Sequence, residues 1–471
     1  MRKLSREEIL QGNPVRVMFT LAIPVMLSQF LFTLYNLADT FWLGHLPASA
    51  SGSAVAGMQV AWPIVWFLIS FSFGFGIAGV ALVSQYTGAG NHKRANVSAS
   101  QVVSISLLFG IAVAIFGYFM MPFIATLITG AEDVSSVAID YMKIYFLGVP
   151  FTFLSFSFQQ VLSAKGDNVT PLYVNIFTVL LNIILDPFLI FGWWVFPSMG
   201  VRGAALATII CEGIAAIIGM TLLFRGIRGI KITLSDMIPD FEWFKKIFRI
   251  GLPAAIGNST TAFGFLVLTG VIGRMPNAEV ALSAYGIGDR LINVIFIVVE
   301  GIGASIVTMI GQNLGANLIK RVEQIARTGI RLEFFISIIE CIVILSLRSV
   351  LFEIFIPGRP DIISEGVKFL SIFTLGIPFF GLFSAIAGVF RGSGHNAPPM
   401  IADIVRLWGV RVPFAYLFGL VLGFGTTGIW WAMAVSNIVA AIVIYIIYLK
   451  VDWKKSVISE QVEVIPVIPE E

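Results

Sequence analysis

Two aspartates stand within apolar segments of this sequence, where a carboxylate has few polar neighbours. Asp39 lies in YNLADTFWLG (35–44), which closes an apolar run that begins near Val15, and Asp186 lies in NIILDPFLIFG (182–192). A charged side chain at the centre of a hydrocarbon layer costs about 2.5–3.5 kcal/mol on insertion scales. Two such carboxylates near one another must share a proton, bind a cation or find basic partners. Their type and setting indicate a joint site for a proton or a small cation.

The composition explains why an apolar setting is expected for these residues. Hydrophobic residues make up 57% of the 471 residues and charged residues only 12%, which is roughly half the charged fraction of a typical soluble domain. Apolar runs of about 20 residues recur along the chain, and each can cross a hydrocarbon layer as a helix. The sequence therefore predicts an all-α polytopic protein of the cell membrane, surrounded by lipid. A net charge of +3 then bears on topology, and no nucleic-acid partner is expected.

We predict twelve membrane-spanning helices from these runs. They lie at roughly 16–44, 54–86, 96–120, 135–163, 170–192, 201–224, 246–273, 280–313, 325–350, 365–391, 398–421 and 427–450. The longest polar stretch divides them evenly. The predicted organisation is an N-terminal six-helix bundle at 1–224, a cytoplasmic linker at 225–245, and a C-terminal six-helix bundle with a short cytoplasmic tail at 246–471.

The two halves share sequence motifs at a nearly constant spacing. SQYTGAGNHKR (84–94) matches GQNLGANLIKR (311–321), and Pro24 pairs with Pro253. Such matches indicate an internal duplication. Because each half holds an even number of spans, the repeat is expected to be parallel, with a pseudo-two-fold axis along the membrane normal. Lys and Arg concentrate in the segments on the side of the termini, which places both termini in the cytoplasm.

Both aspartates are expected near the outer ends of their spans. Asp39 comes five residues before Gly44, and Asp186 six residues before the end of its own span. At a rise of about 1.5 Å per residue, both carboxylates lie about 7–9 Å inside the outer end. In the register of the repeat, Asp39 maps onto Leu268 and Asp186 onto the region of Val412. The acidic pair is therefore expected in the N-terminal bundle only.

Polar side chains on neighbouring helices extend this site. Asn182 lies one turn before Asp186, and Tyr141 and Thr208 reach a similar depth on two other spans. Their oxygens suit a hard monovalent cation and can also hydrogen-bond a protonated acid. We therefore predict either a proton site or a Na⁺ site formed by Asp39, Asn182 and Asp186. Other polar residues of the first and fifth spans are predicted to line a substrate cleft: Ser28, Tyr35, Asn36, Asn175 and Thr178.

Two further features of the spans bear on movement and on a second site. Pro24 lies in the middle of the first span, and its ring removes a backbone hydrogen bond, so the helix is expected to bend there. In the C-terminal half, Glu300 has no basic residue within a turn or two on its own helix. It is the candidate for a second protonatable or substrate-contacting site. Asp403 and Arg406 are three residues apart and are predicted to pair.

Two motifs suggest enzymes and are set aside. GFGIAG (74–79) fits a dinucleotide-binding pattern but lies inside a predicted span, so close helix packing explains its glycines better. GIGD (286–289) fits the pattern of intramembrane aspartyl proteases, a remote alternative, yet the Tyr-Asp motif of those enzymes is missing from the sequence. The sequence has no ATP-binding loop, and its cysteines and histidines lack metal-ligand spacing. We expect a transporter without a cofactor, driven by an ion gradient, and not an enzyme.

These features together resemble the multidrug and toxic compound extrusion (MATE) family, and within it the DinF-like branch. The resemblance covers nearly the whole chain and rests on GNPVRVMFTLAIPVMLSQFLFTLYNLADTFWLG (12–44), NIILDPFLIFG (182–192) and GVRGAALAT (200–208). It implies two six-helix bundles around a central cleft. It also implies export of amphipathic, often cationic xenobiotic compounds in exchange for H⁺ or Na⁺ by alternating access. A monomer is expected.

The resemblance also assigns roles to individual residues. Asp39 and Asp186 become the coupling carboxylates, Pro24 the point where the first helix bends, and Asn182 and Tyr141 members of the coupling network. Thr208 corresponds to the family's helix-6 threonine, although the variable loop before it leaves Ala204 as the other assignment.

A flippase for lipid-linked precursors is the alternative within the same fold superfamily. The N-terminal half has almost no Lys or Arg within its spans, which argues against an anionic pyrophosphate headgroup. Arg290, Arg406 and Arg411 in the C-terminal half leave room for this alternative.

Overall fold

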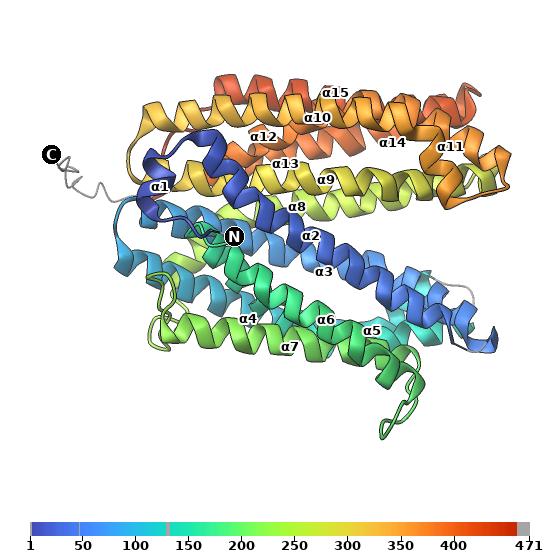
Figure 1. Ribbon diagram of the computed structural model, residues 1–471, viewed down its shortest axis with the longest axis horizontal. Helices are drawn as coiled ribbons and strands as arrows, with labels where there is room; N and C mark the ends of the chain where they lie inside the picture. The colour runs from blue at the N-terminus through green and yellow to red at the C-terminus, as the bar shows by residue number, and fades with distance from the viewer. Residues whose placement is uncertain (1, 47, 129–131, 459–471) are drawn as a thin grey trace. The chain divides into compact units, whose positions relative to one another are not determined.

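The computed structural model of the protein describes residues 2–46, 48–128 and 132–458. These residues form helices joined by loops and contain no β-strand (Figure 1). Within them, twelve helical spans are long and apolar enough to cross a membrane. The predicted all-α architecture with twelve candidate membrane-spanning helices is confirmed.

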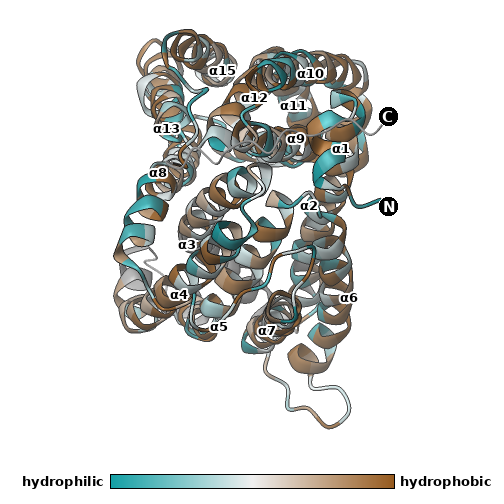
Figure 2. Ribbon diagram, turned by 90° about the vertical axis from the view of Figure 1, so that its left-hand side faces the viewer, coloured by the Kyte–Doolittle hydropathy of each residue, from teal (hydrophilic) through white to brown (hydrophobic). Residues whose placement is uncertain are grey.

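The first half of the chain is built from long continuous helices. A short helix, α1 (Arg6–Gln11), comes before them. The spans are α2 (Pro14–Gly44), α3 (Ala48–Gly88), α4 (His92–Ile128), α5 (Glu132–Ala164), α6 (Val169–Phe191) and α7 (Val201–Arg225). Hydrophobic residues dominate these helices and those of the second half (Figure 2), as helices that face lipid require.

The second half has four long helices and two composite spans. The long helices are α8 (Phe241–Ile272), α9 (Ala278–Gly315), α10 (Ile319–Phe355) and α15 (Gly425–Lys450). One composite span joins α11 (Pro360–Phe373), a 3₁₀ turn η1 (Thr374–Gly376) and α12 (Ile377–Ser393). The other joins α13 (Ala397–Ile404), a π-helical segment η2 (Val405–Arg411), α14 (Val412–Tyr416) and a second π-helical segment η3 (Leu417–Val421).

The chain folds into two compact units, and two helices belong to both. The N-terminal unit comprises residues 1–5 and 27–255, and the C-terminal unit comprises residues 6–26 and 256–471. The division of α2 falls shortly after Pro24, and the division of α8 falls shortly after Pro253. Because these two prolines pair in the internal repeat and each lacks a backbone N–H, both linking helices are weakened at equivalent places.

Helix α6 carries Asp186, and local interactions fix both of its ends. At its start, Asp167 Oδ1 accepts hydrogen bonds from the backbone N–H groups of Val169 and Thr170, at 3.1 and 2.9 Å. A short acidic side chain in this position satisfies N–H groups that have no partner within the helix. At its end, Gly192 has a φ of 75°, a left-handed conformation that favours glycine. The helix therefore has a defined length and register.

Small residues bring α7 close to α6. A Cβ on Gly203 would lie 2.3 Å from the carbonyl oxygen of Leu189, so only glycine allows the two backbones to approach this closely. The contact is next to the turn of α6 that carries Asp186. It therefore positions the following turns of α7 beside that aspartate.

The dinucleotide-like motif serves the same purpose in α3. A Cβ on Gly74 would lie 2.6 Å from the carbonyl oxygen of Gly251 on α8, and one on Gly251 would lie 2.7 Å from the carbonyl oxygen of Gly74. These glycines permit helix packing within the N-terminal unit, as the sequence predicts.

Candidate functional site

Asp39 of α2 and Asp186 of α6 meet in the interior of the N-terminal unit. Asp39 is 1% exposed and Asp186 is 0% exposed, and their carboxyl groups are within hydrogen-bonding reach of each other. A carboxylate can only accept hydrogen bonds, so this contact requires a proton on one of the two groups. The structure thus brings together the two acids that the sequence singles out.

Asn182 joins the two acids. With its amide oriented to satisfy both neighbours, its nitrogen donates to Asp39 Oδ1 at 3.2 Å and to Asp186 Oδ2 at 3.3 Å. The side chain is completely buried. In this orientation the amide is a donor, which suits a shared proton. A Na⁺ ion between the carboxyls would need the amide turned so that its oxygen becomes a ligand.

Tyr35 and Thr208 link α2 to α7 next to this pair. The Tyr35 hydroxyl donates to Thr208 Oγ1 at 2.6 Å, and Thr208 Oγ1 in turn donates to the backbone carbonyl of Ala204 at 3.0 Å. Thr208 therefore contacts the tyrosine through its side chain, while Ala204 provides a backbone acceptor. Tyr141 of α5 is buried within electrostatic reach of both aspartates.

The remaining residues predicted for the substrate cleft lie outside the carboxyl contact. Thr178 donates to the carbonyl of Val174, and the Asn36 amide to the carbonyl of Phe32, both within their own helices. Asn175 reaches α5, where its amide donates to Gln159 Oε1 at 3.4 Å. Ser28 is half-buried on α2. Their role as cleft residues stays a prediction.

Glu212 is a third acid of this region that sequence reasoning missed. It is half-buried on α7, one turn after Thr208 and on the same face. It lies within hydrogen-bonding reach of Ser155 of α5 and within electrostatic reach of Tyr35 and Tyr145. The available signal was the i, i+4 spacing from Thr208, which places both side chains on the inner face.

The three acids lack basic neighbours. Among the ion pairs of the described residues, none includes Asp39, Asp186 or Glu212. No group of three or more His, Cys, Asp or Glu side chains that could hold a metal ion occurs in this part of the chain or elsewhere in the described ranges. The buried carboxyl pair is therefore not neutralised by an ion pair within the described residues.

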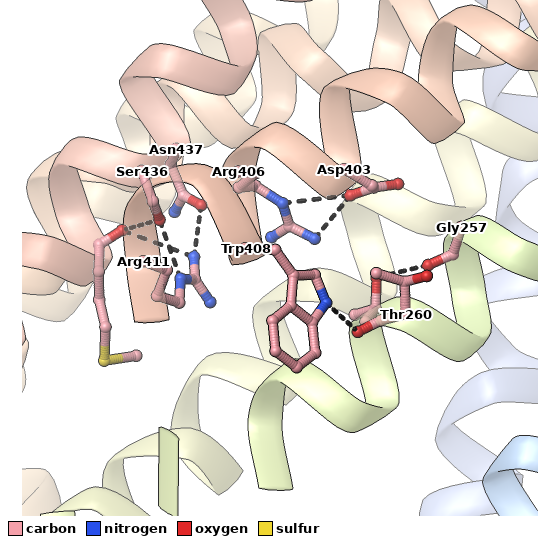
Figure 3. Close-up of polar contacts among 10 residues, drawn as sticks. Gly257, Thr260, Asp403, Arg406, Trp408, Arg411, Ser436 and Asn437 are labelled. Atoms are coloured by element: carbon pink, nitrogen blue, oxygen red, sulfur yellow. Dashed lines mark hydrogen bonds and ion pairs between the residues drawn. The ribbon is translucent and has the colours of Figure 1, made fainter. Parts of the chain in front are cut away.

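Two arginines of the C-terminal unit are buried with polar partners (Figure 3). Arg406 Nη2 lies 2.8 Å from Asp403 Oδ1, so the predicted pair is confirmed. The guanidinium of Arg411 donates to Ser436 at 2.9 Å and to Asn437 at 2.7 Å. Since both arginines are buried and engaged, they offer little to an anionic headgroup of the kind a flippase would bind.

Pro24 and Glu300 complete the residues that the sequence singled out. Pro24 is buried inside α2, which continues as a helix on both sides of it. Glu300 is exposed on α9. The bend at Pro24 and the second site at Glu300 stay predictions.

Comparison with known proteins relates the chain to transporters. The sequence model of the MatE family matches residues 24–188 and 253–417, so the matches begin at Pro24 and Pro253 and agree with the internal duplication. The chain is 27% identical to the probable multidrug resistance protein YoeA of Bacillus subtilis, covering 95% of this chain and 96% of that protein. It is 28% identical to the probable multidrug resistance protein NorM of Thermotoga maritima, covering 96% and 95%.

Solved structures show the same fold. The crystal structure of MATE in the bent conformation superposes with a TM-score of 0.86 at 23% sequence identity, covering 95% of this chain and 98% of that chain. The branch within the family is not resolved by these similarities and stays a prediction.

Proposed function

Since the chain belongs to the MatE family, whose members are transporters and not enzymes, we propose that it is a secondary active multidrug efflux transporter. It exports small amphipathic, mainly cationic compounds in exchange for a cation that enters. Two relatives that align over nearly their whole length are named as probable multidrug resistance proteins, which supports this substrate class. The proposal includes a monomer in the cell membrane that needs no cofactor.

The observation that carries the coupling proposal is the buried contact between Asp39 and Asp186. Two ionised carboxylates in such surroundings repel each other, whereas one proton allows them to hydrogen-bond. Loading therefore pulls α2 towards α6, and unloading releases α2. Because α2 continues from the C-terminal unit into the N-terminal unit just after Pro24, a shift of its outer part can change how the units move. Alternation between loaded and unloaded pairs couples the cation to export.

We take the proton as the coupling ion. The Asn182 amide donates to both carboxyls in the arrangement that satisfies all three side chains, and a proton needs no further ligand. Sodium coupling at Asp39, Asn182 and Asp186 is the other outcome, and it would require the amide to turn.

The proposal also covers topology. The Lys and Arg distribution supports cytoplasmic termini and a cytoplasmic linker at 225–245, between bundles at 1–224 and 246–471.

Efflux from proteoliposomes tests the proposal. The wild type is expected to extrude ethidium under an imposed pH gradient and not under an imposed Na⁺ gradient. Asp39→Asn should abolish gradient-driven efflux, because an amide cannot bind and release a proton. The matched control is Asp140→Asn on α5, whose partly exposed carboxylate pairs with Arg202 at 2.9 Å. Normal efflux by the Asp39→Asn protein would overturn coupling at this pair, and efflux driven only by Na⁺ would replace the proton with sodium.

A further inference from the structure

Helix α10 of the C-terminal unit carries two glutamates on one face. Glu333, Ser337 and Glu340 follow each other at i, i+4 and i+7, which places them in a row. Glu333 and Ser337 are 0% exposed. All four carboxyl oxygens and the Ser337 hydroxyl are buried, and these three side chains do not hydrogen-bond one another.

Helix α12 covers this row closely. A Cβ on Gly381 would lie 2.2 Å from Ser337 Oγ, so the glycine lets the two helices approach at the centre of the row. The Ser384 hydroxyl of α12 is within hydrogen-bonding reach of Glu333, and the charged groups that act on Glu333 are Glu340 and Arg391. Neither glutamate takes part in any ion pair within the described ranges. Arg391 is therefore too distant to act as a counter-ion in contact.

Buried carboxyls without a basic partner must be neutralised. Residues seven apart on a helix are separated by about 10 Å along its axis, so a metal ion shared by the two groups would require both side chains to converge. A proton on each group needs no such closeness. The row is distinct from the acidic pair of the N-terminal unit, since it lies on a helix of the other unit.

We propose that Glu333 and Glu340 form a second proton-carrying site, in which both carboxyls are protonated in this conformation and Glu333 releases its proton when the packing of α10 against α12 changes during transport. In the present packing the carboxyl oxygens of both glutamates are buried, so release requires a movement of α10 against α12 that admits water, and water accepts the proton. Return of the helices to this packing requires that the carboxyl takes up a proton again.

The internal repeat supports a dedicated role for these acids. Helix α4 of the first half occupies the position in the repeat that corresponds to α10, and its sequence contains no acidic residue. The glutamates of α10 are thus not required by the shared scaffold. Protonation of the row stands by itself, and only its exchange during transport rests on the proposed function.

Infrared spectroscopy of the purified protein tests the protonation. A protonated carboxyl has a carbonyl stretching band that an ionised carboxylate lacks. Glu333→Gln and Glu340→Gln should each remove part of this band at neutral pH. The control Glu353→Gln, an exposed glutamate near the outer end of the same helix, should leave the band intact. An unchanged band in Glu333→Gln would overturn the proposal. If Glu333→Gln does not fold, an unchanged band in Glu340→Gln would overturn it instead.

Proton release tests the exchange. Tetraphenylphosphonium is added to wild-type protein in weakly buffered detergent that contains a pH indicator. Glu333→Gln should release fewer protons per bound cation than Glu353→Gln does. Loss of the infrared band without any change in proton release would overturn the exchange step. Asp39→Asn is measured in parallel. Unchanged proton release by the Asp39→Asn protein would count against coupling at the aspartate pair, whereas the glutamate proposal is decided by Glu333→Gln alone.

Discussion

The Asp39–Asp186 pair of the N-terminal unit and the Asp403–Arg406 pair of the C-terminal unit bury charge in opposite ways. In the N-terminal unit, Asp39 and Asp186 have the same sign and contact each other from different helices. In the C-terminal unit, Arg406 faces Asp403 at 2.8 Å. A like-charged pair needs a neutralising charge from outside the protein, whereas an oppositely charged pair already contains it. The first arrangement suits a site that binds and releases a cation, and the second suits a permanent structural contact.

Removal of Asp403 should have the largest effect on stability. Asp403→Ala leaves the buried guanidinium of Arg406 without its counter-ion, and breaking a buried pair in this way costs about 3–5 kcal/mol. Thermal unfolding of the purified protein measures the loss. The double variant Asp403→Ala/Arg406→Met should recover most of it, because no uncompensated charge remains. A double variant as unstable as the single one would show that the pair is not the cause.

Asp186→Asn should reduce transport and leave stability nearly unchanged, in contrast to Asp403→Ala. The amide keeps the shape and hydrogen-bonding capacity of the side chain but cannot exchange a proton, so proton-driven ethidium efflux should fall at least about 100-fold, equivalent to about 2.7 kcal/mol. The melting temperature should change little, since no charge loses a partner. Retained efflux together with lower stability would place Asp186 among the structural charges and would remove the contrast between the two pairs.

Much of this contrast could be predicted from the sequence. Charged residues in apolar spans are costly and therefore few, and the fixed rise of a helix converts sequence position into depth. These two facts are sufficient to pair Asp39 with Asp186 and to place Asn182 beside them. The i, i+3 spacing is sufficient for the contact between Asp403 and Arg406.

Other features depend on packing that the sequence does not display. The burial of Glu212 and of the α10 glutamates depends on how each helix is rotated about its axis. That rotation follows from contacts with neighbouring helices and cannot be read from the sequence. The π-helical segment η2 (Val405–Arg411) lies within a span that is predicted as an ordinary helix. No periodicity in the sequence marks the change in its backbone hydrogen-bond pattern. The contact of Thr208 with Tyr35, rather than with a carboxyl, has the same origin.

Glu212→Gln should separate substrate binding from cation coupling within the N-terminal unit. Its half-buried carboxylate lies on the inner face of α7 near Tyr35 and Tyr145, where an organic cation can meet both a negative charge and aromatic rings. We expect the apparent affinity for tetraphenylphosphonium to fall about 10-fold, or about 1.4 kcal/mol, with little change for an uncharged dye. Equal losses for both ligands in a binding assay would contradict a charge-specific role.

Tyr35→Phe should have the smallest effect of the series. It removes the 2.6 Å hydrogen bond to Thr208, but Thr208 keeps its bond to the carbonyl of Ala204, so no buried donor is left without a partner. A hydrogen bond of this kind contributes about 0.5–1.5 kcal/mol, which should appear as a modest decrease in melting temperature with efflux reduced only a few-fold. Thr208→Val is the matched variant, and it should cost more because it strands the tyrosine hydroxyl in the interior. If Tyr35→Phe instead abolished efflux as Asp186→Asn does, the tyrosine would belong to the proton path, and the coupling site would extend from the two aspartates to α7.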